Sequence, residues 1–187
     1  MINRKEIVVL GALEFSSIVA GFMAMDAMVK IAPVKIIEAR TISSGKYLIV
    51  FTGDVASVEY AFNKGNETGG GFIVDRLFLP QIHQDVIQAF GNIVKTAAWD
   101  AIGIIETTSV ISGIEAADAA AKAGGVKIIE IRVADGFGGK SYVKMTGSLT
   151  DVQTAMEAGT RQAKTKDTLC MDTIIPQPHN EIMPFFM

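Results

Sequence analysis

The chain is poor in the residues that usually carry out nucleophilic or metal chemistry. Its 187 residues include one cysteine, Cys170, and two histidines, His83 and His179. An imidazole or thiolate binds a metal only with further ligands around it, and no cluster of Cys, Asp or Glu accompanies either histidine. One cysteine also gives no internal disulfide framework. We therefore expect no catalytic centre and no metal site, and we expect Cys170 to be a buried structural thiol.

One stretch imitates a phosphate-binding loop. Residues 134–141, ADGFGGKS, fit a relaxed form of that pattern, with Ala134 in the position of the first glycine. A phosphate loop needs a helix after it, whose N-terminus faces the phosphate. The residues that follow, 141–147, instead alternate as a strand does. The sequence thus argues against nucleotide binding, and a nucleotide-dependent enzyme would have to lose activity on Lys140→Ala.

Two glutamates, Glu14 and Glu106, end two similar apolar stretches and could be functional. Buried acids usually need a charged or hydrogen-bonding partner. We therefore expect each glutamate to be paired within the fold. With no Ser-His-Asp order and no convergent acid pair, the sequence favours a protein that is not an enzyme.

Composition excludes several classes of function. The net charge of −3 argues against nucleic-acid binding, which usually needs a basic patch. The chain lacks the apolar run of about 18 residues that a transmembrane helix needs, and its start is a poor match to a signal peptide. We expect a cytoplasmic protein with no membrane partner. A mean hydropathy of +0.34 favours buried contacts between subunits.

The positions of these residues follow from an internal repeat. Residues 11–40 align without a gap on residues 103–132, including VKIIEAR in the first copy and VKIIEIR in the second. A Gly-Lys pair follows at 45–46 and again at 139–140, so the second copy has a loop two residues longer. The repeat predicts two tandem domains of one kind. We place them at residues 1–95 and 96–187.

Each copy predicts the order strand, helix, strand, strand, helix, strand. Ser17 is a good N-cap for the first helix, and Pro33 ends it. Asp54 is the expected cap of the second helix and Gly65 its end. The elements expected in the first copy are strands at 8–15, 34–42, 46–53 and 71–80, and helices at 17–32 and 54–65. This order is that of the ferredoxin-like split βαβ fold, an α+β class with an antiparallel sheet and its helices on one face.

Three stretches carry a family resemblance. MDAMVKIAPVKIIEARTISSGKY (25–47), TGDVASVEYAF (52–62) and IIPQPH (174–179) resemble the bacterial microcompartment shell domain. Two such domains in one chain resemble the tandem class, with its closest likeness to members from propanediol-utilisation compartments. The resemblance implies a structural protein of the shell, a pseudohexameric homotrimer that tiles the facet. It also implies other shell proteins, enclosed enzymes and small metabolites as partners.

The resemblance also assigns residues to the edges of the tile. Lys30 and Lys122 match the family's edge lysine, and the alternative is two solvated helix lysines. Gln81 and Gln177 stand where the family often has arginine, whose charge and donor fork glutamine lacks. The same segments carry both histidines, for which an edge or helix-capping role is expected.

The turns between the second and third strands of each copy line a pore in the family. The residues expected there are Ser43, Ser44, Gly45, Gly136, Phe137 and Gly138. Some family members have a cysteine at the position of Ser43 and hold an iron–sulfur cluster. Serine is not a thiolate, so we expect no cluster here. The serines could form a polar ring for small metabolites, narrowed by Phe137, or could be ordinary turn residues in a closed gap.

Ferredoxin-like repeats also build regulatory modules that bind small molecules. Fold does not determine function, so a small-molecule sensor is the main alternative. Such a protein would remain a discrete oligomer and would bind a metabolite.

Overall fold

The computed structural model describes residues 3–96, 99–136 and 138–186. The chain separates into two compact units, the first comprising residues 1–84 with 134–139 and the second residues 85–133 with 140–187. Each unit contains one copy of the repeat. Among the described residues, no helix is both long and apolar enough to span a membrane.

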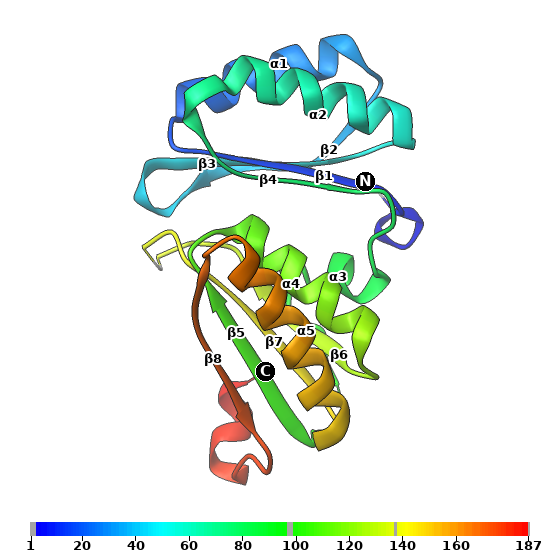
Figure 1. The fold of residues 1–187 in the computed structure, drawn as a ribbon, viewed down its shortest axis with the longest axis vertical. Coiled ribbons are helices and arrows are strands. Elements are labelled where there is room, and N and C mark those ends of the chain that lie inside the picture. Colours follow the sequence, from blue (N-terminus) through cyan, green and yellow to red (C-terminus); the bar gives the residue numbers. More distant parts are fainter. Residues whose placement is uncertain (1–2, 97–98, 137, 187) are drawn as a thin grey trace. The chain divides into compact units, whose positions relative to one another are not determined.

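The first unit is a four-stranded antiparallel sheet with two long helices on one face (Figure 1). Its strand order, β2-β3-β1-β4, is that of the ferredoxin-like fold predicted from the sequence. The elements are η1 (Arg4–Glu6), β1 (Leu10–Phe15), α1 (Ile18–Ile31), β2 (Lys35–Ile42), η2 (Ser43–Gly45), β3 (Lys46–Thr52), α2 (Val55–Gly69), η3 (Gly70–Phe72) and β4 (Ile73–Leu79).

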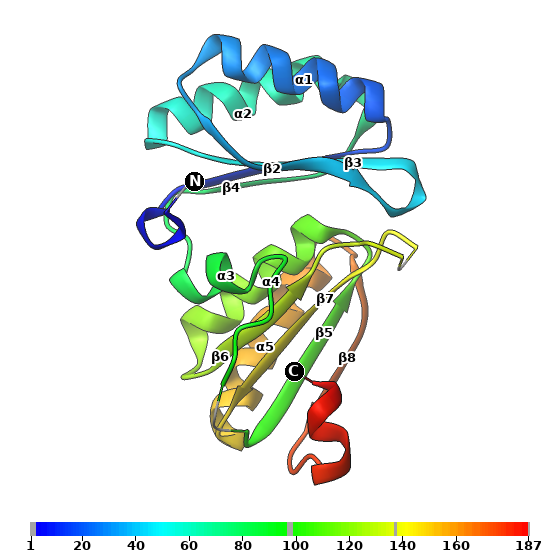
Figure 2. The same cartoon turned by 180° about the vertical axis from the view of Figure 1, so that it is seen from behind.

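The second unit repeats this topology, with strand order β6-β7-β5-β8 (Figure 2). Short helix α3 (Gln84–Ala89) precedes it, and a 3-10 helix, η4 (Asn180–Phe185), follows its last strand. The remaining elements are β5 (Ala101–Thr107), α4 (Val110–Ala123), β6 (Lys127–Arg132), β7 (Ser141–Gly147), α5 (Leu149–Thr165) and β8 (Leu169–Ile175). The α+β class predicted from the repeat is confirmed in both units.

The helix starts follow the capping residues predicted from the sequence. The Ser17 hydroxyl accepts a hydrogen bond from the backbone N–H of Ala20 at 3.3 Å, and Asp54 accepts one from Ser57 at 2.9 Å. Each cap satisfies a backbone donor that the helix leaves free, which stabilises by about 1 kcal/mol. Helix α1 ends at Ile31, just before the predicted stop at Pro33.

The predicted end of α2 at Gly65 is wrong, because the helix continues to Gly69. A Cβ atom on Gly65 would lie 2.4 Å from Leu13 Cδ1 and 2.7 Å from Met28 Sδ. Gly65 is therefore small so that α2 can pack closely on β1 and α1. The residue that ends the helix is Gly70, whose φ of +49° disfavours residues with a side chain.

The core of the first unit lies between the sheet and its helices. Leu13 and Phe15 of β1 and Met28 of α1 have no exposed side-chain surface, and Ile49 and Phe51 of β3 complete the layer. Burying each side chain of this size stabilises by about 1.5–3 kcal/mol. The alternation of side chains along β1 and β3 therefore fixes which residues face the helices and which face the other side of the sheet.

The structure also decides two expectations about the second copy. Strand β6 ends at Arg132 and pairs antiparallel with β7, so the segment that imitates a phosphate loop is a strand-to-strand connection, as predicted. Cys170 is exposed, and the expectation of a buried thiol is wrong. It lies on β8, whose residues 170–173 are exposed; among the described strands β8 pairs with β5 alone, at the edge of the sheet.

Candidate functional site

The turn between β2 and β3 holds three of the residues predicted to line a pore. Ser43, Ser44 and Gly45 form the single turn η2, and β2 and β3 pair up to Ile42 and Lys46 on either side of it. Ser44 has φ +66° and Gly45 φ +70°. Left-handed backbone costs a residue with a side chain roughly 1–2 kcal/mol, so Ser44 is held there by the hairpin around it.

The corresponding loop of the second copy, residues 134–139, belongs to the first unit and lies against this turn. The backbone N–H of Ser43 donates to the carbonyl of Ala134 at 2.9 Å. The backbone N–H of Gly136 donates to the Ser43 hydroxyl at 2.7 Å. The structure thus brings together Ser43 and Gly136, two residues that are 93 positions apart in the sequence.

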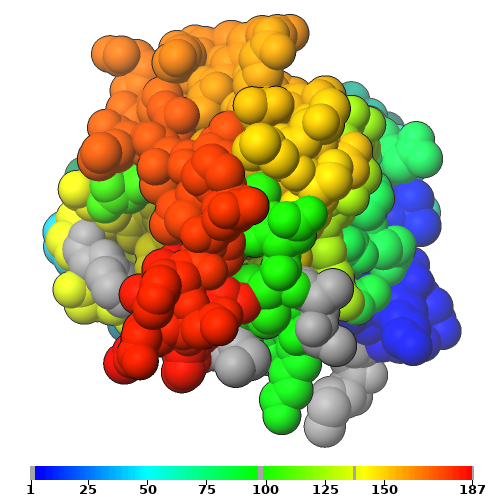
Figure 3. All heavy atoms as spheres, turned by 90° about the horizontal axis from the view of Figure 1, so that it is seen from below, coloured from blue at the N-terminus to red at the C-terminus, as the bar shows by residue number. Residues whose placement is uncertain are grey.

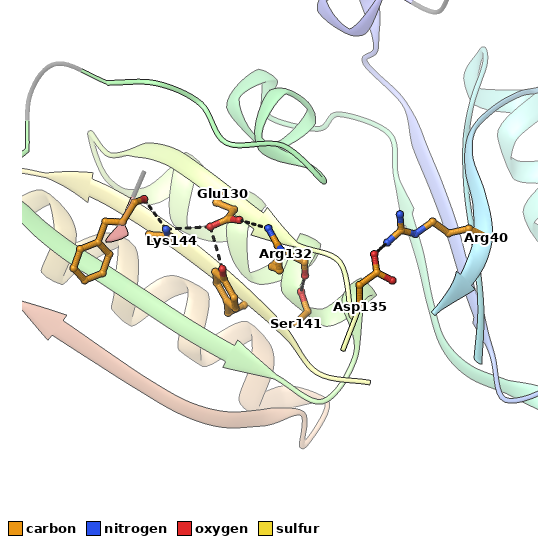
Figure 4. Close-up of polar contacts among 8 residues, drawn as sticks. Arg40, Glu130, Arg132, Asp135, Ser141 and Lys144 are labelled. Atoms are coloured by element: carbon orange, nitrogen blue, oxygen red, sulfur yellow. Dashed lines mark hydrogen bonds and ion pairs between the residues drawn. The ribbon is translucent and has the colours of Figure 1, made fainter. Parts of the chain in front are cut away.

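An ion pair that sequence reasoning missed fastens the same loop. The guanidinium of Arg40, at the end of β2, donates to the carboxylate of Asp135 (Figure 4). Arg40 Nε also lies 3.8 Å from Glu38 Oε1. The only signal in the sequence was a basic residue three places before the turn, and nothing there indicated a partner in the other copy.

The loop itself needs glycine. Gly136 has φ +78° and Gly138 φ +61°, and both have open space where a Cβ would be. Backbone conformation, rather than crowding, therefore selects glycine at these two positions. Phe137, predicted to narrow the opening, lies outside the described residues.

The Gly-Lys lysines fasten each turn to its sheet. Lys46 Nζ lies 2.8 Å from Glu14 Oε1, and the Glu14 side chain has no exposed surface. In the second copy Lys140 Nζ lies 3.1 Å from Glu106 Oε1, and its pKa is raised by the hydrogen bond and charge of that carboxylate. The predicted pairing of both glutamates is confirmed.

The lysines and glutamines predicted at tile edges lie on the surface of the chain. Lys30 and Lys122 each form an ion pair with the aspartate one turn earlier, Asp26 at 2.5 Å and Asp118 at 2.6 Å. Lys30 keeps 72% of its side-chain surface exposed and Lys122 43%. Gln81 and Gln177 are both exposed.

The two histidines differ in their surroundings. His83 is half-buried, and His179 is exposed at the start of η4. Nδ1 of His179 accepts a hydrogen bond from the backbone N–H of Glu181 at 3.2 Å. This contact caps η4 and is one of the two roles expected for the histidines.

The part of the chain that the structure describes offers few side chains that could bind a metal ion or a cluster. No group of three or more His, Cys, Asp or Glu side chains lies together there in a way that could hold a metal ion. The hydroxyl of Ser43, which the sequence resemblance led us to expect in place of a cysteine, accepts a hydrogen bond from the backbone N–H of Gly136. A hydroxyl in this environment does not fit an iron–sulfur cluster, which thiolates normally hold.

The fold and the paired turns define a class. The profile of the BMC domain family matches residues 9–82 and 101–178, which together are most of the chain. The chain therefore belongs to the BMC-domain family and is a shell protein of a bacterial microcompartment with two BMC domains in tandem. Its place is the microcompartment shell, and its role is structural rather than enzymatic.

Individual relatives agree with this assignment. The chain is 38% identical over 173 residues to the bacterial microcompartment shell protein PduT of Citrobacter freundii, covering 92% of this chain and 94% of that protein. The crystal structure of a microcompartment protein from Desulfitobacterium hafniense is 37% identical, covers 95% of this chain and 99% of that one, and superimposes with a TM-score of 0.84. The shell protein EutM of Salmonella typhimurium is 31% identical over 87 residues, covering 46% of this chain and 88% of EutM.

Proposed function

We propose that three copies of this chain close into a pseudohexameric tile of the shell facet. Two domains of one family in each chain give six domains in a trimer, which is the number that a six-sided tile needs. Closed rings arise when one surface of each subunit meets a different surface of the next. The proposed domains are residues 1–95 and 96–187, with the six-residue edge set as contacts to neighbouring shell proteins. That set is Lys30, Lys122, Gln81, Gln177, His83 and His179.

We further propose that the two turns line a central opening for small metabolites. The observation that carries this proposal is the pair of hydrogen bonds joining Ser43 to Ala134 and Gly136. They hold the turn 43–45 beside residues 134–136, so that the Ser43 hydroxyl and the backbone groups of both segments lie close together. Backbone groups and hydroxyls of this kind can replace the hydrogen bonds that a polar metabolite makes with water.

The proposed opening carries no iron–sulfur cluster. The Ser43 hydroxyl accepts one hydrogen bond from the loop and still has its own proton to donate. Three such groups around an axis would form a ring of neutral donors. The other proposed partners are neighbouring shell proteins and the enzymes enclosed by the shell. The metabolite that passes the opening would be a substrate or product of those enzymes.

The test is native mass spectrometry and negative-stain electron microscopy of the purified protein, with an absorbance spectrum of the same sample. A colourless trimer that forms six-sided tiles or sheets supports a shell tile that lacks an iron–sulfur cluster. A brown trimer that tiles would overturn the absence of a cluster and leave the tile intact. A monomer or dimer that never tiles would overturn the trimer and its pore.

A further inference from the structure

The face of the second sheet that points away from α4 and α5, here called the open face, contains a network of charged side chains that are nevertheless buried. A Cβ on Gly103 would meet Met145 and also Met156 of α5, so Met145 faces the helices. Side chains alternate along a strand, so Lys144 faces the opposite way. Lys144 is nevertheless only 6% exposed, and Glu130 on the neighbouring strand is 3% exposed.

The charges in this network satisfy one another. Lys144 Nζ lies 3.0 Å from Glu130 Oε2 (Figure 4). Glu130 also accepts a hydrogen bond from the Tyr142 hydroxyl at 3.1 Å and one from Arg132 at 3.2 Å. Burial, followed by the charge of Glu130, raises the pKa of Tyr142. An ion pair removed from water needs such additional partners to offset its lost hydration.

The last partner of Lys144 comes from the segment after β8. Residues 180–186, here called the strap, place the carbonyl oxygen of Phe186 2.6 Å from Lys144 Nζ. The same ammonium lies 5.5 Å from the centre of the Phe186 ring, and that ring lies 6.4 Å from the ring of Trp99. In Figure 3 the red end of the chain forms a surface patch beside the green segment that leads into β5.

The strap itself is weakly held. It is mostly the 3-10 helix η4, which has poorer hydrogen-bond geometry than an α-helix, and none of its residues is buried. Ile182 is 38% exposed and Phe185 86% exposed. Segments with few buried apolar contacts are the ones that open locally without global unfolding. A weakly held element thus covers a network that needs to stay covered.

We propose that the strap is a releasable cover of the open face of the second sheet. Closed, it completes the partners of Lys144. Open, it presents the ammonium group of Lys144 and the ring of Trp99 as a docking surface for a short peptide segment with the same chemistry, an aromatic side chain and a carbonyl oxygen. The strap of the chain itself is the occupant seen here. The inference does not depend on the proposed trimer or pore.

Trp99 is the single tryptophan of the chain and reports on the contact directly. Full-length Phe186→Ala should shift Trp99 emission to longer wavelength and increase its quenching by acrylamide. The matched control is Phe185→Ala, whose ring is exposed and should leave both readouts unchanged. Equal emission and quenching in wild type and Phe186→Ala would overturn the proposed cover.

Release is tested by exchange and by replacement. In wild type, the amide hydrogens of Ile182 and Phe186 should exchange much faster than those of β7, and exchange only at the rate of global unfolding would overturn release. A synthetic peptide of residues 179–186 added to a chain ending at Pro178 should restore the wild-type emission. If that shortened chain does not fold, the same peptide is added to full-length Phe186→Ala. A folded variant unaffected by saturating peptide would overturn the docking surface.

Discussion

At the scale of single residues, the two copies of the repeat use the same ion pair in different surroundings. Glu14 has no exposed side-chain surface and its partner Lys46 only 17%, whereas Glu106 is 36% exposed and Lys140 50%. Water and salt screen an exposed ion pair strongly and a buried ion pair much less. Ion pairs at equivalent positions of the two copies therefore contribute unequally to the stability of the fold.

Lys46→Met should destabilise the protein by about 3–5 kcal/mol, because it removes the cation that faces a fully buried carboxylate. Lys140→Met removes the equivalent cation from a carboxylate that water can reach, and its effect should be much smaller. Urea unfolding of the two variants beside wild type measures both. Equal losses of stability would contradict the argument from burial.

Asp54 gives a prediction about pH. Hydrogen bonds from the Ser57 hydroxyl and the Ser57 backbone N–H hold the pKa of Asp54 below its ordinary value of 3.8. Because the pKa is lower in the folded chain, ionised Asp54 favours folding above the ordinary value. This contribution is lost as the pH falls through the folded value.

The matched variant is Asp54→Asn, since asparagine caps helices about as well as aspartate but does not titrate in this range. Thermal unfolding measured from pH 5 down to about pH 3 should show a steeper fall in the melting temperature of wild type than of Asp54→Asn. Parallel curves would show that Asp54 contributes no pH dependence.

At the scale of elements, the sequence predicted what depends on local pattern. Alternation and capping residues gave the strands and the starts of the helices, and Ser17 and Asp54 both cap as expected. The exposure of Cys170 was missed because alternation does not say whether a strand is paired on both sides. The pair of Arg40 and Asp135 was missed because its members are 95 residues apart and only the folded chain brings them together.

Gly65 shows how packing overrides local preference. Gly65→Ala should favour the isolated helix by roughly 1 kcal/mol. In the folded protein, however, its Cβ would crowd Leu13 and Met28, and overpacking of this kind typically costs about 1–3 kcal/mol. We expect a net loss of stability in urea unfolding. Gly71→Ala, which has open space for its Cβ, is the control and should change stability little; a stabilised Gly65→Ala would show that α2 can shift to make room.

At the scale of the whole molecule, the duplication gives the chain the same lysine–aspartate pair twice, once in each domain. Lys30 and Lys122 occupy equivalent positions near the ends of α1 and α4, each paired with an aspartate one turn earlier. The proposed tile would present the same kind of contact on successive sides, which requires this equivalence. The pair of Lys30 and Asp26 is exposed at both ends and adds little to folding, whereas the Asp118 end of the second pair is only 7% exposed.

These lysines allow tiling to be tested in a protein that still folds. The double variant Lys30→Ala/Lys122→Ala should lose some stability, and the loss should come mainly from Lys122, whose partner Asp118 is only 7% exposed, while Asp26 is 62% exposed. The double variant should keep the native mass of the proposed trimer, since the proposed edge lies between trimers. Under the electron microscope it should form separate tiles where wild type forms sheets. Lys164→Ala, at an exposed lysine near the end of α5, is the control and should form sheets like wild type. If the double variant forms normal sheets, the two lysines are solvated helix residues and do not make the edge contacts. Other members of the proposed edge set would then have to make them.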